Sequence, residues 1–268
     1  MTHTPHRLEV HHANIGYGNK IILNDLSFQI PHGARVAVVG PNGAGKSTLF
    51  KTLVGLLPLQ SGKILIHGES LGAHKDCVAY IPQREEVDWK FPVTVYDVVM
   101  MGRYGQRGWL SRPSKQDKEI VNNSLEKMGI ANLAKQSIGE LSGGQQQRVF
   151  LARAISQEPH ILLMDEPFTG VDVTTQETTL NLLDHLREKE VTMMISTHDL
   201  NLAASRFDYV LLLNHKLIAF GKPPAVFVKE NLAQAFGNSL LVMENGMMLV
   251  DECCPPDEEH HHTKSVVE

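Results

Sequence analysis

One nine-residue run constrains this chain more than any other feature, because it needs a strand before it and a helix after it. The run extends from Gly40 to Thr48 and fits the pattern G-x-x-x-x-G-K-[S/T]. An apolar stretch of β type, residues 35–39, precedes it, and a helical pattern follows it. Glycines let a backbone wrap closely around phosphate oxygens, and a helix start directs N–H groups at them. The sequence therefore predicts a phosphate-binding loop in an α/β fold.

The loop residues are expected to share the binding of a nucleotide's phosphates. Lys46 would reach the β- and γ-phosphates, and the Ser47 hydroxyl would bind Mg²⁺. A glycine turn before a helix is the alternative, and the strand-loop-helix setting argues against it. The predicted loop consists of Gly40, Pro41, Asn42, Gly43, Ala44, Gly45, Lys46, Ser47 and Thr48.

A second glycine-containing stretch, residues 141–148, begins another predicted helix. Ser142 is a typical helix N-cap, and Gly143 and Gly144 allow a close approach of the backbone to a bound group. Helical periodicity follows in residues 149–155. A helix start with a hydroxyl and free N–H groups can bind an anion, yet a simple capped helix explains the pattern equally well.

Two carboxylates follow a buried-type strand at residues 161–164. Asp165 at the strand end can hold Mg²⁺, through water, because this ion keeps much of its hydration shell. Glu166, one residue later, points in a different direction from Asp165 and can act on an attacking water as general base. A solvated turn is the alternative for an isolated Asp-Glu pair. A further strand, residues 192–196, leads to His198, which would be a surface residue in most other settings.

These segments, in this order, resemble the ATP-binding-cassette (ABC) ATPases over about residues 7–237. The resemblance implies that Asp165 belongs to the Walker B segment, that Glu166 is the catalytic base, and that His198 is the switch histidine that senses the γ-phosphate. It also implies that the signature contacts the γ-phosphate of ATP held by the opposite subunit of a head-to-tail homodimer. The signature residues are Ser142, Gly143, Gly144 and Gln145.

Three more positions follow from the same resemblance. Tyr17 lies where the family stacks an aromatic ring on adenine, a role that any exposed ring can fill. Gln83 matches the Q-loop glutamine, which contacts Mg²⁺ and relays the nucleotide state to a membrane partner. Asp172 matches the D-loop aspartate that crosses the dimer interface, although the segment reads Gly-Val-Asp instead of the commoner Ala-Leu-Asp.

The expected fold is an α/β P-loop ATPase core with a mostly parallel sheet. Residues 8–30 predict two antiparallel strands that open a β subdomain. About 120 residues separate Lys46 from Asp165, far more than one βα crossover needs, so we expect an inserted helical subdomain at about 88–156. The ATPase domain is predicted to span residues 7–237. A C-terminal extension, 238–268, would hold a hairpin around residues 244–246 and a disordered end.

Composition excludes several classes of protein. The net charge of −5 and the scattered Lys and Arg argue against a nucleic-acid surface. Three cysteines do not form a disulfide framework and fit a reducing compartment. No apolar run reaches the ~20 residues that span a bilayer, so membrane association would come through a partner. The tail holds possible metal ligands, Cys253, Cys254 and His260 to His262, although a loose polar terminus is the preferred interpretation.

The segment after Gln83 indicates what is transported. Residues 88–92 (Asp-Trp-Lys-Phe-Pro) and 101–105 (Met-Gly-Arg-Tyr-Gly) resemble the ATPases of manganese, zinc and iron importers. Exposed aromatics here suit a groove for a partner helix, and the alternative is that Trp89 and Phe91 pack the helical lobe.

The resemblance implies a subunit that hydrolyses ATP for a divalent-metal importer, with manganese placed before zinc and iron. Its partners would be a second ATPase copy, integral membrane permease subunits and, indirectly, an extracytoplasmic metal-binding protein. The subunit would lie on the cytoplasmic side of the cell membrane, held peripherally by the permease subunits. The alternatives are a haem or siderophore importer ATPase, and a soluble ABC ATPase outside transport.

Overall fold

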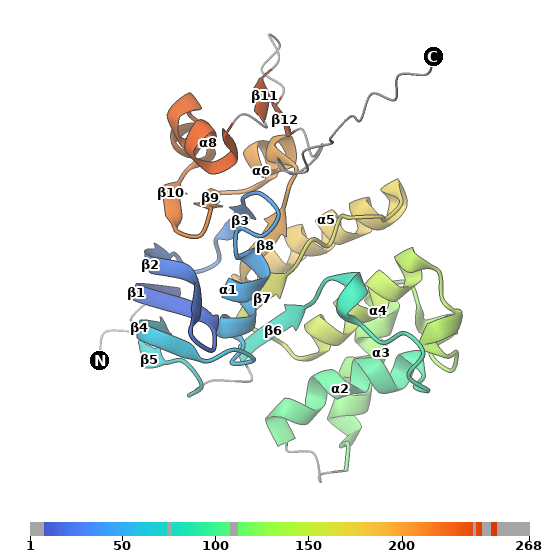
Figure 1. Cartoon of the computed structure of the whole chain (residues 1–268). Helices are drawn as coiled ribbons and strands as arrows, with labels where there is room; N and C mark the ends of the chain where they lie inside the picture. The colour runs from blue at the N-terminus through green and yellow to red at the C-terminus, as the bar shows by residue number, and fades with distance from the viewer. Residues whose placement is uncertain (1–7, 74–76, 108–111, 238–239, 243–247, 251–268) are drawn as a thin grey trace, which may run out of the picture.

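The protein has two large β-sheets, of which the antiparallel one lies at the left of Figure 1. The computed structural model describes residues 8–73, 77–107, 112–237, 240–242 and 248–250. The first sheet is antiparallel, in the order β2-β1-β4-β5, with β1 (Leu8–Tyr17), β2 (Lys20–Ile30), β4 (Leu59–Ile66) and β5 (Glu69–Ser70). The central sheet has the order β10-β9-β3-β8-β7-β6, with β3 (Arg35–Val39), β6 (Val78–Ile81), β7 (Ile161–Met164), β8 (Thr192–Thr197), β9 (Tyr209–Leu213) and β10 (Leu217–Gly221).

The central sheet is buried on both faces. Its strands pair in parallel except β10, which is antiparallel to β9. Because side chains alternate along a strand, Val36 and Val38 of β3 enter one core, whereas Ala37 and Val39 enter the other. Two-sided burial explains why these strands read as nearly continuous apolar runs.

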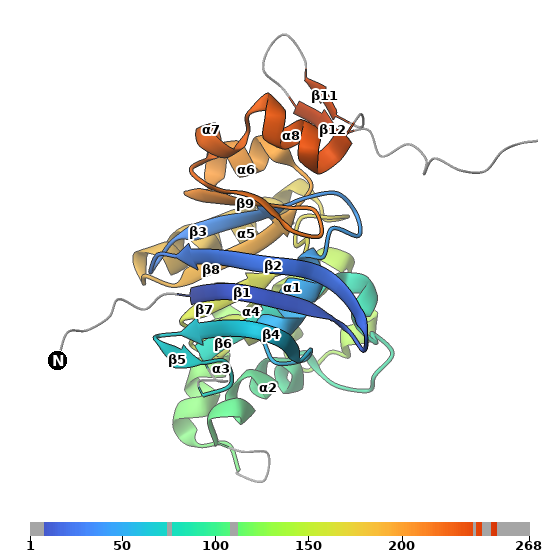
Figure 2. The same cartoon turned by 60° about the vertical axis from the view of Figure 1, so that its left-hand side comes forward.

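Helices cover both sides of this sheet (Figure 2). Helix α1 (Lys46–Leu53) places Leu49, Phe50 and Leu53 in the core that the antiparallel sheet shares with one face of the central sheet. The other core receives α5 (Val173–Glu188), α6 (Leu200–Arg206), α7 (Pro223–Val226) and α8 (Lys229–Phe236).

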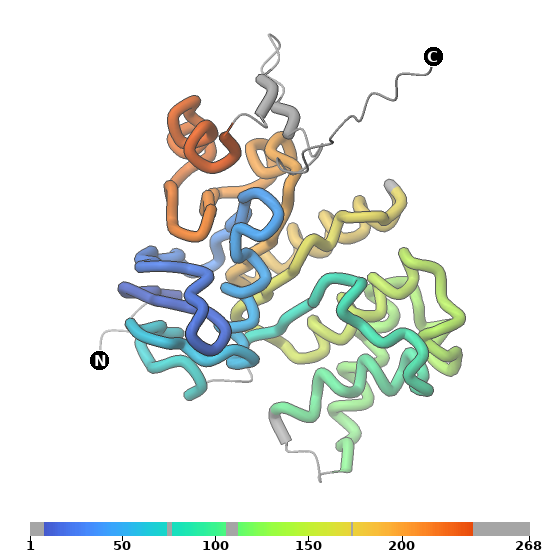
Figure 3. Tube along the Cα trace, viewed as in Figure 1, coloured from blue at the N-terminus to red at the C-terminus, as the bar shows by residue number. Residues whose placement is uncertain are grey.

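Three further helices gather into a lobe beside the sheet core, which the chain trace shows most clearly (Figure 3). They are α2 (Val95–Arg107), α3 (Lys115–Lys127) and α4 (Gly143–Ser156), with short 3₁₀ turns η2 (Arg84–Glu86), η3 (Ala131–Leu133) and η4 (Ile138–Glu140) around them. The buried Arg103 of α2 bonds to Asp117 of α3 at 3.2 Å and to the Ser156 carbonyl of α4 at 2.6 Å. This guanidinium therefore ties the three helices together.

The expected fold class is confirmed: a mostly parallel sheet, an antiparallel β subdomain at the start and an inserted helical lobe. The predicted hairpin after residue 238 is present as β11 (Leu240–Val242) paired with β12 (Met248–Val250). Its turn and the tail with Cys253, Cys254 and His260 to His262 lie outside the described residues. Within the ranges given above, no helix has the length and apolar character needed to cross a membrane.

Candidate functional site

The glycine-rich loop lies between the end of β3 and the start of α1. Gly45, the N-cap of α1, has φ of 101°, a backbone conformation that is strained for residues with a side chain. A Cβ at Gly40 would lie 2.0 Å from the Leu213 carbonyl oxygen, so only glycine allows this close passage. Gly45 has no side chain to cap the helix, which leaves the first N–H groups of α1 suited to an anion.

The loop borders a cavity of about 270 Å³ lined by Asn42 to Thr48, Gln83 and Glu166. Lys46 is buried, and its Nζ donates to the carbonyl oxygens of Gly40 at 2.9 Å and Pro41 at 3.3 Å. The same nitrogen lies 3.6 Å from Glu166 Oε1. A phosphate in this cavity would offer the ammonium a charged partner in place of neutral carbonyls, and charged partners form the stronger bonds.

Asp165 is buried at the end of β7. Its Oδ1 accepts a 2.5 Å hydrogen bond from Ser196 Oγ, and its buried Oδ2 makes no hydrogen bond of ordinary geometry to the described residues. Burial raises the pKa of Asp165, and the hydroxyls of Ser196 and Ser47 offset part of the rise. A buried, unsatisfied carboxylate oxygen beside a serine hydroxyl fits a hard cation that prefers oxygen ligands, such as Mg²⁺.

Glu166 faces the loop in a strained backbone conformation. Its φ is 47°, and its backbone N–H donates to Ser196 Oγ at 2.8 Å. Its Oε2 accepts from Thr169 Oγ1 at 3.2 Å and lies 3.5 Å from His198 Nδ1. Non-glycine residues with positive φ are uncommon and are concentrated at functional sites. The carboxylate is thus fixed between the Lys46 ammonium and a half-exposed imidazole.

Gln83 lines the loop cavity, and the residue after it joins the helical lobe. Arg84 Nε donates to Gln146 Oε1 of α4 at 3.2 Å, and the Arg84 carbonyl accepts from Trp89 Nε1 at 2.9 Å. The segment from β6 to α2 is therefore in direct contact with α4, the helix that begins with the signature.

The signature forms the capped start of α4, as predicted. Ser142 Oγ accepts from the Gln145 N–H at 3.3 Å, and the Gln145 side chain accepts from the Ser142 N–H at 2.8 Å. Gly143 and Gly144 are half-buried, and each lies against another segment of the chain. An added Cβ would lie 2.8 Å from Arg84 Nη1 at Gly143 and 2.4 Å from Thr175 Oγ1 at Gly144. No signature residue is among the described residues that line the loop cavity.

Two other predicted positions lie outside the loop cavity. The Tyr17 ring is 50% exposed at the end of β1. Asp172 caps α5, since its carboxylate accepts the N–H and the hydroxyl of Thr175, and these bonds lower the pKa of Asp172. Their proposed contacts with adenine and with a second subunit stay predictions.

A groove of about 410 Å³ opens behind the Q-loop. Leu56, which is 70% exposed, Tyr80, Pro82 and Arg153 line it. Of the two predicted docking aromatics, Phe91 is exposed, whereas Trp89 packs on Phe150 at a 5.2 Å centroid distance. Trp89 is half-buried and packs the helical lobe, which is the alternative that the sequence left open, and neither ring is among the groove residues described. Contact of Phe91 with a partner stays a prediction.

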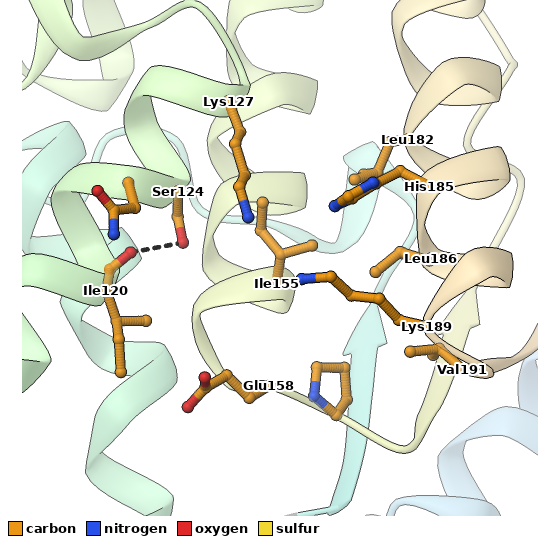
Figure 4. A pocket seen from close by; sticks show the side chains of 12 residues that line it. Ile120, Ser124, Lys127, Ile155, Glu158, Leu182, His185, Leu186, Lys189 and Val191 are labelled. Atoms are coloured by element: carbon orange, nitrogen blue, oxygen red, sulfur yellow. Dashed lines mark hydrogen bonds between the residues drawn. The ribbon is translucent and has the colours of Figure 1, made fainter.

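A third cavity, of about 320 Å³, lies where the helical lobe meets α5 (Figure 4). Lys127 of α3, His185 of α5 and Lys189, which directly follows α5, point into it, and Ile155 and Leu186 add apolar lining. None of its described lining residues belongs to the phosphate loop or the signature. It marks the joint between the lobe and the sheet core.

Sequence reasoning missed Ser196, which bonds to both acidic residues of the site. It also missed Arg84 and the groove residues Leu56 and Arg153. The change from the apolar run Met193 to Ile195 to the polar Ser196 and Thr197 at the end of β8 was the available signal for Ser196. The others depend on contacts between segments far apart in the chain.

Comparisons with known proteins agree on one family. The family described as ABC transporter matches residues 23–169. The manganese transport system ATP-binding protein MntB of Bacillus subtilis is 46% identical over 241 residues, which cover 90% of this chain and 96% of that protein. The zinc transport system ATP-binding protein TroB of Treponema pallidum is 44% identical over 237 residues, which cover 88% and 89%.

Among solved structures, a chain of an ABC transporter in an inward-facing conformation superposes with a TM-score of 0.77. It is 27% identical, and the match covers 91% of this chain and 97% of that chain. The likeness therefore extends over both sheets and the helical lobe.

Proposed function

Since the chain belongs to the ABC transporter family and binds ATP, we propose that it is the ATP-hydrolysing subunit of an importer for divalent metal ions. The observation that supports this best is the meeting of Lys46, Glu166 and His198 at the glycine-rich loop. The same edge of the sheet holds Asp165 and Gln83. A cation and a carboxylate base line one cavity, and an imidazole lies 3.5 Å from that carboxylate, which is an arrangement that suits hydrolysis of a nucleotide.

The proposed roles follow from the contacts. The α1 N–H groups and Lys46 bind the phosphates, and Tyr17 supports the adenine. Ser47, Asp165 and Gln83 would hold Mg²⁺, which when bound neutralises phosphate charge. Glu166 orients and deprotonates the attacking water, and His198 senses the γ-phosphate. Ser196 positions Asp165 and Glu166 through its two hydrogen bonds.

Glu166→Gln tests the chemistry. The variant keeps the shape of the side chain and removes the base, so ATP binding should persist while hydrolysis falls roughly 10²–10⁴-fold. ATP binding is measured by fluorescent-nucleotide titration and turnover by phosphate release, with Lys46→Ala as the variant that weakens binding itself. Near-normal turnover of Glu166→Gln would remove Glu166 from this role.

We further propose a head-to-tail homodimer in which Ser142, Gly143, Gly144 and Gln145 act on ATP held by the partner. The separation of the signature from the loop cavity within one chain supports this arrangement. Ser142→Arg should bind ATP as a monomer and fail to hydrolyse it. Mixing it with Lys46→Ala should restore activity through dimers with one intact composite site. A mixture no more active than either variant alone would contradict the arrangement.

The permease subunits, as we propose, dock a helix into the groove of Leu56, Tyr80, Pro82 and Arg153. The groove combines apolar side chains with the charged side chains of Arg153 and Glu86, and interfaces commonly combine these two features. Glu86 pairs with Lys51 at 2.6 Å. Docking there would hold the subunit peripherally on the cytoplasmic side of the membrane. An extracytoplasmic metal-binding protein would then act on it only through the permease.

The relatives' names favour manganese, followed by zinc, as the transported ion. Iron stays an alternative, as does a haem or siderophore cargo, because no cargo contact is expected on this subunit. Metal uptake by vesicles holding the assembled complex and the loaded binding protein decides between them. Failure to co-purify any permease would favour a soluble ABC ATPase. Deleting residues 251–268 should leave the metal dependence of transport unchanged.

A further inference from the structure

Three metal-ligating side chains from separate segments meet at the opposite end of the strands from the phosphate loop. His67 lies in the turn between β4 and β5, Cys77 directly precedes β6, and His160 directly precedes β7. Their ligand atoms all lie within 4.8 Å of one another. We propose that His67, Cys77 and His160 form a zinc-binding site.

The spacing fits tetrahedral zinc. Zn–N bonds of about 2.0–2.1 Å place two bound nitrogens about 3.3–3.4 Å apart. His67 Nε2 and His160 Nδ1 lie 3.1 Å apart, with the two rings inclined at 79°. The two rings share this contact as a hydrogen bond, and zinc would replace its proton with a small increase in the distance between the nitrogens.

The backbone around the cluster is firmly held. The His160 N–H donates to the Cys77 carbonyl at 2.8 Å, and the Thr192 N–H donates to the His160 carbonyl at 2.9 Å. His67 and Gly68 form the two-residue turn between Ile66 and Glu69, with φ of 55° and 80°. Asparagine or glycine usually occupies the first turn position, so a histidine there is a less common choice.

The donor set selects the ion. One thiolate and two imidazoles are borderline to soft ligands that suit zinc, whereas manganese and magnesium prefer carboxylate and carbonyl oxygens. His67 and Cys77 are half-buried and His160 is exposed, so an ion can enter from solvent. Three protein ligands leave a fourth position for water, which is typical of zinc sites that are not purely structural.

The cluster joins the antiparallel sheet to the central sheet without touching the nucleotide site. Strands β6 and β7 each have four residues and are therefore about 13 Å long. The cluster lies at the beginning of both strands, and Gln83 and Asp165 lie beyond their ends. Zinc should therefore bind whether or not the chain hydrolyses ATP. Lys46→Ala should keep zinc affinity, which separates this proposal from the proposed function.

The test uses the full chain with Cys253→Ser and Cys254→Ser. The protein has three cysteines, so Cys77 is then its single thiol. Cobalt(II), a spectroscopic substitute for zinc, should bind with one equivalent and give a thiolate-to-cobalt charge-transfer band. One equivalent of zinc should remove the band, and excess manganese should not. Zinc at about 100 times its Kd should raise the Tm by about 5 °C.

Further substitutions in this background identify the ligands. Cys77→Ser should abolish the band and weaken zinc binding by more than about 100-fold, since even outer-shell changes cost about 10–100-fold. His67→Asn keeps a residue that tolerates the turn and should weaken binding comparably, as should His160→Gln. His185→Gln, an exposed histidine on α5, is the matched control.

Folding is checked for each variant by circular dichroism and by Tm without metal. No charge-transfer band in the double-serine background would overturn the proposal. So would a zinc affinity that His67→Asn and His160→Gln leave unchanged, because the ion would then be held by other groups.

Discussion

Replacing Ser196 by alanine tests how the two acidic residues are held. Ser196 is fully buried, donates to the Asp165 carboxylate and accepts the Glu166 N–H. Losing a bond to a charged group costs about 1.5–3 kcal/mol, and an unsatisfied buried N–H costs about 1–3 kcal/mol. We therefore expect a loss of roughly 3 kcal/mol in the free energy of unfolding.

The rate of ATP hydrolysis by Ser196→Ala should fall further than its loss of stability explains. Without the bond from Ser196, Glu166 loses the contact that holds its strained backbone, and a misplacement of about 1 Å can reduce turnover about 10²-fold. The Ser196 hydroxyl also lowers the pKa of Asp165, so its removal raises that pKa. The acidic limb of the pH–rate profile should move to higher pH, because the ionised carboxylate is the form that binds a cation.

Ser156→Ala is the matched control. Ser156 is equally buried and donates to the carbonyls of Val99 and Arg153, inside the helical lobe. Urea unfolding gives the stability of both variants, and phosphate release by the folded protein gives turnover at several pH values. If Ser196→Ala loses no more turnover than Ser156→Ala and its pH profile stays in place, the positioning role of Ser196 is wrong.

Two other substitutions address the charge and the groove. Burial raises the pKa of Asp165, so the folded state binds its proton more tightly than the unfolded chain, and ionisation lowers stability as pH rises through the folded pKa. Asp165→Asn should therefore raise the Tm of the nucleotide-free protein at pH 7, while stabilisation by Mg-ATP is lost. The gain in Tm should shrink as the pH falls through the raised folded pKa and should be gone below about pH 4, where the carboxyl is protonated in both states; an unchanged Tm at pH 7 would contradict this. Leu56→Asp should abolish co-purification with the permease and keep ATP binding, whereas Ile21→Asp, an exposed position on β2 outside the groove, should keep both.

The glycine-rich loop was predictable because its chemistry is local. Strand, loop and helix follow one another in sequence, and the residues of each segment are enough to predict its structure. The inserted lobe was predictable because the distance from Lys46 to Asp165 exceeds any single crossover. The apolar run of β3 also predicts that the strand is buried on both faces. It does not predict that β8 and β9 are the strands that pair with it.

The parts that escaped prediction depend on pairing between distant strands. Ser196 meets Asp165 only because β8 lies beside β7, with Met164 opposite Ile195. The zinc ligands meet because β6 and β7 begin side by side next to the β4–β5 turn. The sequence leaves Trp89 open between docking and packing, because its contact with Phe150 joins residues 61 positions apart and has no local signal.

The two signature glycines differ in what surrounds them, and this separates packing from phosphate contact. A Cβ at Gly144 would lie 2.4 Å from Thr175 Oγ1 and 2.8 Å from Asp172 Oδ2, both on short side chains that cap α5. Gly144→Ala should therefore destabilise the fold by about 1–3 kcal/mol. A Cβ at Gly143 would meet Arg84 Nη1 at 2.8 Å, and a long side chain can move away.

Gly143→Ala should consequently fold with nearly normal stability and still lose hydrolysis, if its backbone approaches a phosphate as proposed. Displacement of Arg84 is the competing explanation, because Arg84 directly follows Gln83 and donates a hydrogen bond to Gln146 of α4. The double variant Gly143→Ala, Arg84→Ala distinguishes them. If turnover in the double variant returns to that of Arg84→Ala alone, Gly143 acts through packing on Arg84. If it stays at the level of Gly143→Ala, the close approach to phosphate is the reason for the glycine.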